Sequence, residues 1–140
     1  MDIAPTILTR RGPCGDTPLA APAWPEPVQT LPQCFDASCD RAPGRVAVEV
    51  GAARVTYAQL DRRANQLAHL LRERGVTAET PVGILLDRSE DTYIVLLGVL
   101  KAGSAYVPLD PSFPADRLNY ITEDSGLHTL VTTTAFRDVT

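Results

Sequence analysis

The sequence of 140 residues is poor in the side chains that build metal sites and disulfides. It contains two histidines and three cysteines. Three cysteines cannot all pair with one another, and Cys34 and Cys39 lie five residues apart, which is not the CxxC spacing of a zinc or redox site. We therefore predict that the cysteines are buried, reduced thiols and that the chain binds no metal ion.

Positive charge and long apolar runs are scarce as well. The net charge is −4, and a single lysine, Lys101, accompanies 12 arginines. This balance argues against a nucleic-acid-binding surface. The apolar run at 94–100 is far shorter than the ~20 residues that span a bilayer, and polar residues interrupt the N-terminus where a secretion signal would be apolar. We expect a cytoplasmic protein that binds neither nucleic acid nor membrane.

What is present fits one soluble globular domain, since 44% of the residues are hydrophobic and 21% are charged. Residues 1–29 hold six of the 12 prolines and no apolar periodicity, so we predict a leader or linker there. Trp24 either anchors this segment on the domain or is exposed. Residues 30–140 form the predicted folded part.

Two capping boxes mark helix starts in the folded part. Thr30 and Gln33 begin a helix that Pro43 and Gly44 end, and Thr56 and Gln59 begin a helix over 57–74. Alternating valines between these helices predict a small β-hairpin over 46–55. The second helix is predicted to be amphipathic. Its buried stripe consists of Leu60, Ala64, Leu67, Ala68 and Leu71. Its solvent-facing side consists of Asp61, Arg62, Arg63, Gln66, Arg72 and Glu73.

A strand, helix, strand unit follows. Residues 81–86 are continuously apolar, as in a strand buried on both faces of a parallel sheet, and the next helix ends at Gly103. Residues 105–107 form a short buried strand in this prediction. Pro108 and Pro111 then stop the strand and turn the chain around Asp110, whose side chain caps local amides.

A second crossover completes the pattern, with a helix over 114–125 and a strand over 128–132. We expect both crossover helices to cover one face of the sheet. The predicted fold is α/β: the start of a mostly parallel sheet with crossover helices, preceded by a helix and a small hairpin. Its open edge is typical of an incomplete doubly wound domain.

No catalytic or cofactor-binding residue emerges from spacing alone. Gly98 and Gly103 have the spacing of a phosphate loop, but lysine does not follow the second glycine and both glycines belong to a helix rather than precede one. His69 and His128 have no partner ligands in register, so we predict a surface residue and a strand residue. The residues by themselves assign no catalytic, cofactor or metal site.

Two motifs nevertheless resemble one family closely. VTYAQL at 55–60 and LKAGSAYVPLDP at 100–111 are similar to the first and second core motifs of adenylation domains of nonribosomal peptide synthetases, within the adenylate-forming superfamily. PVGILLDRS and FPADRLNYITEDSG match in order and spacing, so the resemblance covers residues 30–134. It implies a structural role for the core-motif residues Thr56, Tyr57, Leu60, Lys101, Ala102, Gly103, Tyr106, Pro108, Leu109, Asp110 and Pro111.

The resemblance implies an enzyme that uses ATP and magnesium to form an aminoacyl adenylate and then loads it onto the phosphopantetheine thiol of a peptidyl carrier protein. The family's phosphate loop, specificity pocket, ribose carboxylate and catalytic lysine follow the region matched here, and Lys101 is not that lysine. The chain is therefore expected to be an N-terminal portion of the family's large subdomain, with no cofactor bound by itself. Its implied partners are the downstream remainder of the domain, the carrier protein and an MbtH-like accessory protein.

Three alternatives remain open on this basis. Met1 and the short leader favour a loading module or a stand-alone adenylation enzyme. A truncated, non-catalytic α/β protein or interaction module is the alternative from another class, so the sequence leaves open whether the chain is an enzyme. The third is part of a ligase that adenylates an acyl or aryl acid.

Overall fold

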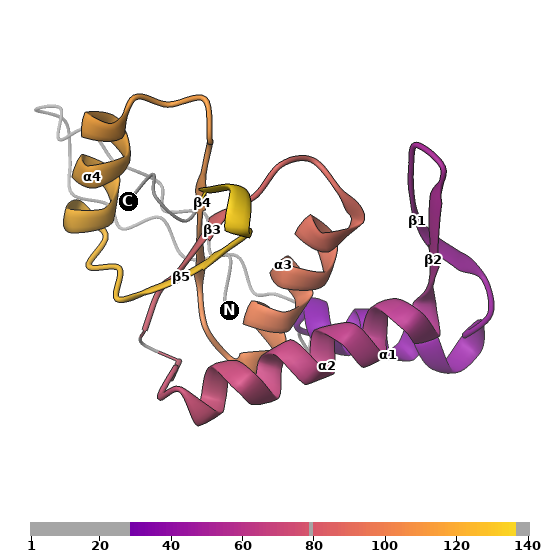
Figure 1. Cartoon of the computed structure of the whole chain (residues 1–140). Coiled ribbons are helices and arrows are strands. Elements are labelled where there is room, and N and C mark those ends of the chain that lie inside the picture. The colour runs from indigo at the N-terminus through magenta and orange to yellow at the C-terminus, as the bar shows by residue number, and fades with distance from the viewer. Residues whose placement is uncertain (1–28, 79, 137–140) are drawn as a thin grey trace, which may run out of the picture.

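The computed structural model describes residues 29–78 and 80–136 (Figure 1). The predicted leader with Trp24 lies outside these ranges, apart from Gln29. The predicted α/β class is confirmed. In chain order the elements are α1 (Leu31–Arg41), β1 (Val46–Val50), β2 (Ala53–Thr56), α2 (Tyr57–Glu73), β3 (Val82–Leu85), α3 (Glu90–Ala102), β4 (Tyr106–Leu109), α4 (Ala115–Asp124), β5 (Thr129–Thr132) and the short 3₁₀ helix η1 (Thr134–Phe136).

The strands form two separate sheets. β1 and β2 make the predicted antiparallel hairpin, and β4, β3 and β5 make a parallel sheet in that order. All four residues of β3 are buried, as its apolar sequence predicts for a central strand. The hairpin stands away from the parallel sheet, beside α1 and the start of α2 (Figure 1).

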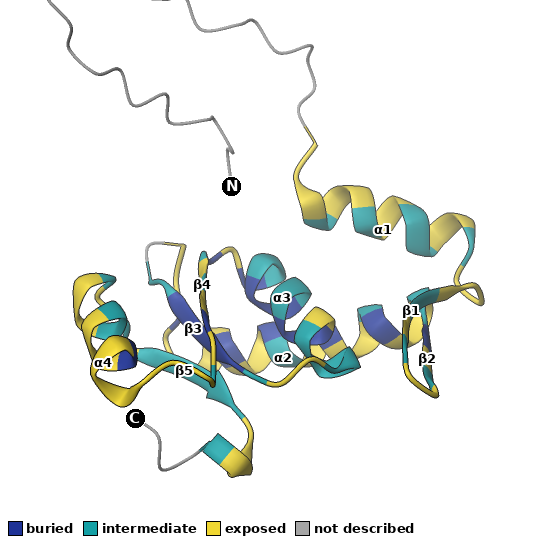
Figure 2. Cartoon of the chain, turned by 90° about the horizontal axis from the view of Figure 1, so that it is seen from above, coloured by how far each residue is buried: buried dark blue, intermediate teal, exposed yellow. Residues whose placement is uncertain are grey.

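The two crossover helices lie on opposite faces of the parallel sheet, so the expectation of a shared face is wrong. Val82 and Ile84 of β3 pack with Val99 of α3, whereas Leu85 packs with Leu118 of α4. Figure 2 shows α4 on one side of the strands and α3 with α2 on the other. The physical reason is the strand order, because β4 and β5 lie on the two sides of β3. The first crossover leads from β3 to β4, and the second leads back from β4 past β3 to β5. Two right-handed crossovers that run in opposite directions along the sheet place their helices on opposite faces.

The face that carries α3 is closed by α2. Leu60, Ala64, Ala68 and Leu71 of α2 are buried, which confirms most of the predicted stripe. Gly98 lets the two helices approach closely, because a Cβ there would lie 2.8 Å from Leu67 Cδ2. No helix in the described residues is long and apolar enough to cross a membrane.

Helix α1 packs only lightly, and it contains no buried residue. Phe35 of α1 lies against the small core cluster of Val55, Leu60 and Ile94. Cys34 is exposed and Cys39 is half-buried, so the prediction of buried thiols is wrong for Cys34. The error follows from the position of α1 at the margin of the described structure, where few side chains cover it.

Candidate functional site

The motif at 100–111 begins where α3 ends. Gly103 adopts φ of 90°, and its N–H donates to Leu100 O, which confirms the predicted glycine stop. The N–H of Ser104 donates to Val99 O, and its hydroxyl, which is buried, donates to Thr80 O. The backbone amides that a phosphate loop would present are therefore already used within the fold.

Lys101 lies between three helices. Its Nζ is 2.9 Å from Asp61 Oδ1 of α2 and also pairs with Asp36 Oδ1 of α1. The Lys101 side chain is 10% exposed and lies 5.8 Å from the centre of the Phe35 ring. Burial by itself lowers the pKa of Lys101, but the hydrogen bonds to Asp36 and Asp61 outweigh it, so the pKa lies above its usual value.

The position of Asp61 corrects its assignment to the solvent-facing side of α2. Its side chain is 29% exposed, and Oδ1 is buried without a well-aligned hydrogen bond. The charge of this oxygen is met by the ammonium of Lys101. Lys101 of α3 thus links α1 and α2 through its ion pairs with Asp36 and Asp61.

Arg72 also stabilises the C-terminal end of α3, a role that the sequence pattern does not predict. Its guanidinium donates to the carbonyls of Lys101 and Ala102, in the last turn of α3. A cation at a helix C-terminus satisfies free carbonyls and interacts favourably with the helix dipole. Lys101 and Ala102 are 29 and 30 residues from Arg72 in the chain, so no local sequence pattern predicts these hydrogen bonds.

The motif at 55–60 starts α2 as predicted. Thr56 Oγ1 accepts a hydrogen bond from the Gln59 N–H at 3.3 Å, and Gln59 Oε1 accepts one from the Thr56 N–H at 2.9 Å. Tyr57 packs on Phe35 of α1 with ring centres 5.7 Å apart, and Leu60 is buried in the core. The capping box therefore orients both α2 and the aromatic contact that holds α1.

The strand after Gly103 differs from the prediction. β4 continues through Pro108 to Leu109, and Tyr106 is 37% exposed rather than buried. Pro108 is tolerated because β4 is an edge strand of the described sheet. Asp110 acts as the predicted turn residue: the Ser112 N–H donates to its Oδ1 at 2.9 Å, and this bond lowers the pKa of Asp110.

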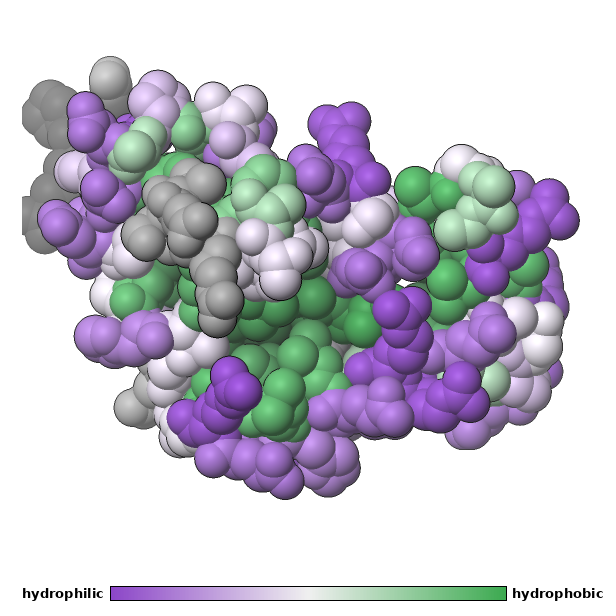
Figure 3. Space-filling model, viewed as in Figure 1, coloured by the Kyte–Doolittle hydropathy of each residue, from purple (hydrophilic) through white to green (hydrophobic). Residues whose placement is uncertain are grey.

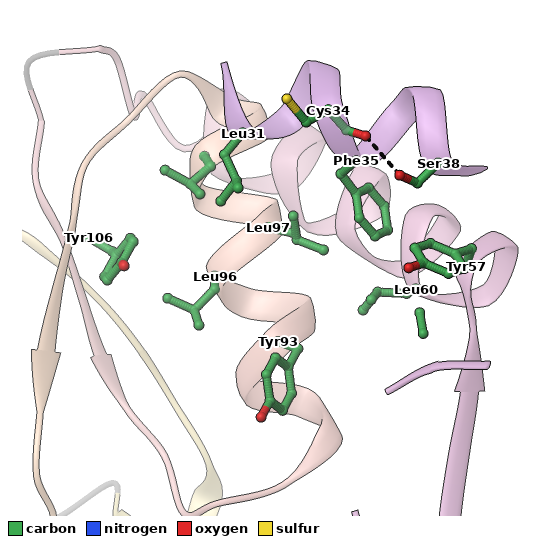
Figure 4. Close-up of a pocket in the computed structure, with 12 residues that line it drawn as sticks. Leu31, Cys34, Phe35, Ser38, Tyr57, Leu60, Tyr93, Leu96, Leu97 and Tyr106 are labelled. Atoms are coloured by element: carbon green, nitrogen blue, oxygen red, sulfur yellow. Dashed lines mark hydrogen bonds between the residues drawn. The ribbon is translucent and has the colours of Figure 1, made fainter. Parts of the chain in front are cut away.

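An apolar groove of about 400 Å³ lies between α1, α3 and β4. Figure 4 shows Phe35, Tyr57, Tyr93 and Tyr106 around it, with Cys34 at its α1 border. On the face of the molecule seen in Figure 3, hydrophobic side chains gather near the middle, with hydrophilic side chains around them. A wider groove of about 1240 Å³ lies beside α1 and includes His69, Arg72 and Lys101. His69 is exposed, as predicted.

Gly98 and the starts of helices α1, α2 and α3 are unsuited to a phosphate group. Gly98 is covered by Leu67, and the N-termini of α1 and α2 are capped by their own Thr and Gln side chains. The first turn of α3 carries Glu90 and Asp91, which would repel a phosphate. No group of three or more His, Cys, Asp or Glu side chains suited to a metal ion occurs in ranges 29–78 and 80–136.

The sequence has clear relatives. The family described as AMP-binding enzyme matches residues 35–140. Tyrocidine synthase 2 of Brevibacillus parabrevis is 48% identical over 95 residues, which are 68% of this chain and 3% of that protein. Bacitracin synthase 3 of Bacillus licheniformis is 47% identical over 103 residues, which are 74% of this chain and 2% of that protein. The chain thus spans a very small part of the curated relatives it matches.

Solved structures agree with this match. A nonribosomal peptide synthetase bound to α-methyl-L-serine-AMP has a TM-score of 0.78 at 34% identity, covering 83% of this chain and 13% of that one. The NpsA N-terminal subdomain of Klebsiella oxytoca has a TM-score of 0.72 at 27% identity, covering 81% and 29%. A fused adenylation and carrier-protein didomain containing NpsA scores 0.69 at 28% identity, covering 72% and 19%. The chain matches the N-terminal portion of such adenylation domains.

Proposed function

Because the chain belongs to the family of AMP-binding enzymes, we propose that it builds the first part of an amino-acid-activating adenylation domain in nonribosomal peptide synthesis. The observation that carries the proposal is the family match over residues 35–140, a stretch that holds both core motifs. In the first step the carboxylate of the amino acid attacks the α-phosphorus of ATP and displaces pyrophosphate, which gives an aminoacyl adenylate. In the second step a thiol attacks the carbonyl carbon, which forms a thioester and releases AMP. In this proposal the chain has a structural role: it supports the parts of the domain that carry the reactive groups.

This support consists of fixed helix ends. Lys101 and Arg72 hold the end of α3, while Thr56 fixes the start of α2. Among the core-motif residues, Thr56 sets where α2 starts, Gly103 where α3 ends, and Asp110 how the chain turns after β4. In this proposal ATP and magnesium are bound by other parts of the complete domain.

Further partners belong to the same proposal. The didomain relative joins an adenylation domain to a carrier protein, so we assign a carrier protein with a phosphopantetheine thiol as the acceptor. An MbtH-like accessory protein is a second partner, tested by co-expression and co-purification with the complete domain. An amino acid is preferred over an aryl acid as the substrate, because the synthetase with bound α-methyl-L-serine-AMP is 34% identical and NpsA, solved with 3-hydroxyanthranilyl and 3-hydroxybenzoyl ligands, is 27% identical.

A fusion protein tests the proposal. In it the full chain replaces the matching 95-residue segment of tyrocidine synthase 2, within an adenylation domain of that protein. We expect ATP–pyrophosphate exchange with the same amino acid as the unmodified parent domain, and none from the 140-residue chain alone. Exchange by the isolated chain, or a folded fusion protein without exchange, would contradict the proposed role.

A further inference from the structure

The apolar groove between α1, α3 and β4 has the lining of a site for an uncharged segment. Four of its side chains are aromatic, and apart from Ser38 the others are aliphatic or the Cys34 thiol. Three of them are too exposed to be core residues, since Leu31 is 62% exposed, Tyr93 47% and Tyr106 37%. Figure 4 shows these three on α1, α3 and β4. Large apolar side chains that are exposed together on one concave surface are typical of a binding site.

The leader before α1 has the composition that such a groove binds. Residues 22–27 read PAWPEP and contain Trp24, the only tryptophan of the chain. Proline-rich sequences favour the extended polyproline II conformation and dock on aromatic-lined grooves at little entropic cost. Their carbonyl groups accept hydrogen bonds from donors such as tyrosine hydroxyls, and three residues of the groove are tyrosines. The groove volume of about 400 Å³ falls in the range of pockets that enclose a group as large as an indole ring.

The start of α1 brings the leader to this groove. Gln29, at which the described structure begins, precedes Leu31 of the groove by two positions. Its Oε1 accepts a hydrogen bond from Cys34 Sγ at 3.5 Å, so Gln29 folds against the side of α1 that borders the groove. Contacts between these two helix positions set the angle at which a chain enters a helix. Thr30 is extended, with φ of −74° and ψ of 158°, so an extended leader continues from it without a turn.

We propose that residues 22–27 of the leader occupy the apolar groove, with the Trp24 ring between Leu31, Tyr93 and Tyr106. Trp24 precedes Gln29 by five residues, which an extended chain spans over at most ~18 Å. Of the two roles that the sequence leaves open for Trp24, this is the anchor. The docked leader gives α1, which buries no residue of its own, a second attachment to α3. The proposal goes beyond the proposed function and does not depend on it.

Fluorescence of the 140-residue chain tests the proposal, because the emission comes from Trp24 alone. We expect acrylamide to quench this emission at least about threefold less efficiently in the folded chain than in urea, because a docked ring is shielded whenever it is bound. Tyr93→Ala should restore most of the quenching, since it removes an exposed wall of the groove. Tyr120→Ala is the matched control, because Tyr120 is 58% exposed on α4 and lines neither of the two grooves.

Three results of this measurement overturn the proposal. In the first, Trp24 of the folded chain is quenched as efficiently as in urea. In the second, Tyr93→Ala and Tyr120→Ala, both folded by circular dichroism, have equal effects. In the third, the shielding of Trp24 is lost on dilution of the protein, which identifies the leader of a second copy as the occupant.

The fusion protein gives a test that does not require the isolated chain to fold, and in it other segments compete for the groove. Labelling with 5-fluorotryptophan gives one fluorine resonance for each tryptophan, and Trp24→Phe identifies the resonance of Trp24. We expect this resonance to shift in Tyr93→Ala and to keep its position in Tyr120→Ala. If Tyr93→Ala leaves it unchanged in a folded fusion protein, the proposal is wrong. Pyrophosphate exchange by that same protein leaves the proposed function intact.

The thiol of Cys34 provides an independent readout. It is exposed in the described structure and borders the groove, so a docked leader shields it. In a Cys14→Ser, Cys39→Ser background, we expect Trp24→Ala to raise the rate at which an aromatic disulfide reagent modifies Cys34 at least about threefold. Pro18→Ala, in the leader but outside residues 22–27, is the control and should leave the rate unchanged. Equal rates in the two variants contradict the proposal.

Discussion

Lys101 Nζ lies 2.9 Å from Asp61 Oδ1, at the point where the end of α3 meets α2. The carboxylate oxygen is buried, and within the described residues the ammonium is the group that balances its charge. Asp36 shares the same ammonium, but its side chain is 52% exposed. The Asp61 contact is therefore the one whose loss leaves an uncompensated charge inside the protein.

Replacing Lys101 by methionine is expected to lower the free energy of unfolding of the fusion protein by about 2 to 4 kcal/mol, because breaking a buried ion pair leaves its partner unpaired. Urea denaturation measures the change. The double variant Lys101→Met, Asp61→Leu should recover part of the loss, and Asp36→Asn should cost less than about 1 kcal/mol. Additive losses in the double variant would mean that the two groups are not coupled.

Alkaline pH should weaken the same contact. The folded pKa of Lys101 is raised above 10.5, so the stability from its charge is complete below that pH and is lost as pH rises through the raised value. Burial and the charge of Asp61 raise the pKa of Cys39 above 9.0, so stability also falls as its thiol ionises. Urea denaturation across this range should give a flatter curve for Lys101→Met in a Cys39→Ser background than for Cys39→Ser alone. Parallel curves would contradict the assignment.

The close approach of α2 and α3 predicts a cost for a methyl group at Gly98. Alanine is the better helix former by roughly 0.5–1 kcal/mol, but its Cβ would lie 2.8 to 3.0 Å from three Leu67 side-chain atoms. We expect Gly98→Ala to be destabilising by about 1–3 kcal/mol in thermal or urea unfolding. Gly44→Ala is the control, since nothing lies within 4 Å of a Cβ there. A stabilised Gly98→Ala protein would show that the helices can separate freely.

The two capping boxes should differ in their effect on the whole domain. Thr56→Ala is expected to cost about 1 kcal/mol of unfolding free energy, with Thr56→Ser close to the parent. Thr30→Ala breaks an equivalent box on α1, which buries no residue, so it should speed amide exchange in α1 with little change in global stability. Equal losses of global stability from both alanine variants would indicate that α1 is an integral part of the core.

Local chemistry made much of this fold predictable. The capping boxes at Thr30 and Thr56 and the glycine stop at Gly103 depend on neighbours within a few residues, and the structure has all three. The faces used by α3 and α4 depend instead on which side of β3 each later strand takes, which hydrophobic patterning does not encode.

The candidate site was less predictable for the same reason. Asp61 and Arg72 both fall on the polar side of an amphipathic helix, and only the arrival of α3 gives them partners 29 to 40 residues away. The sequence predicts that Pro108 ends its strand, but at the edge of the described sheet its missing N–H breaks no hydrogen bond to a neighbouring strand. In each case the deciding fact was a contact between distant segments.

The enclosed ammonium of Lys101 also determines how the protein responds to amine-reactive reagents. It is the sole lysine, so apart from the chain's N-terminus no other amine is present for an activated ester to modify. With 10% of its side chain exposed and two carboxylates holding its proton, Lys101 should react slowly until its contacts with α1 and α2 open. The rate of acylation at Lys101 therefore reports how often its contacts with Asp36 and Asp61 open.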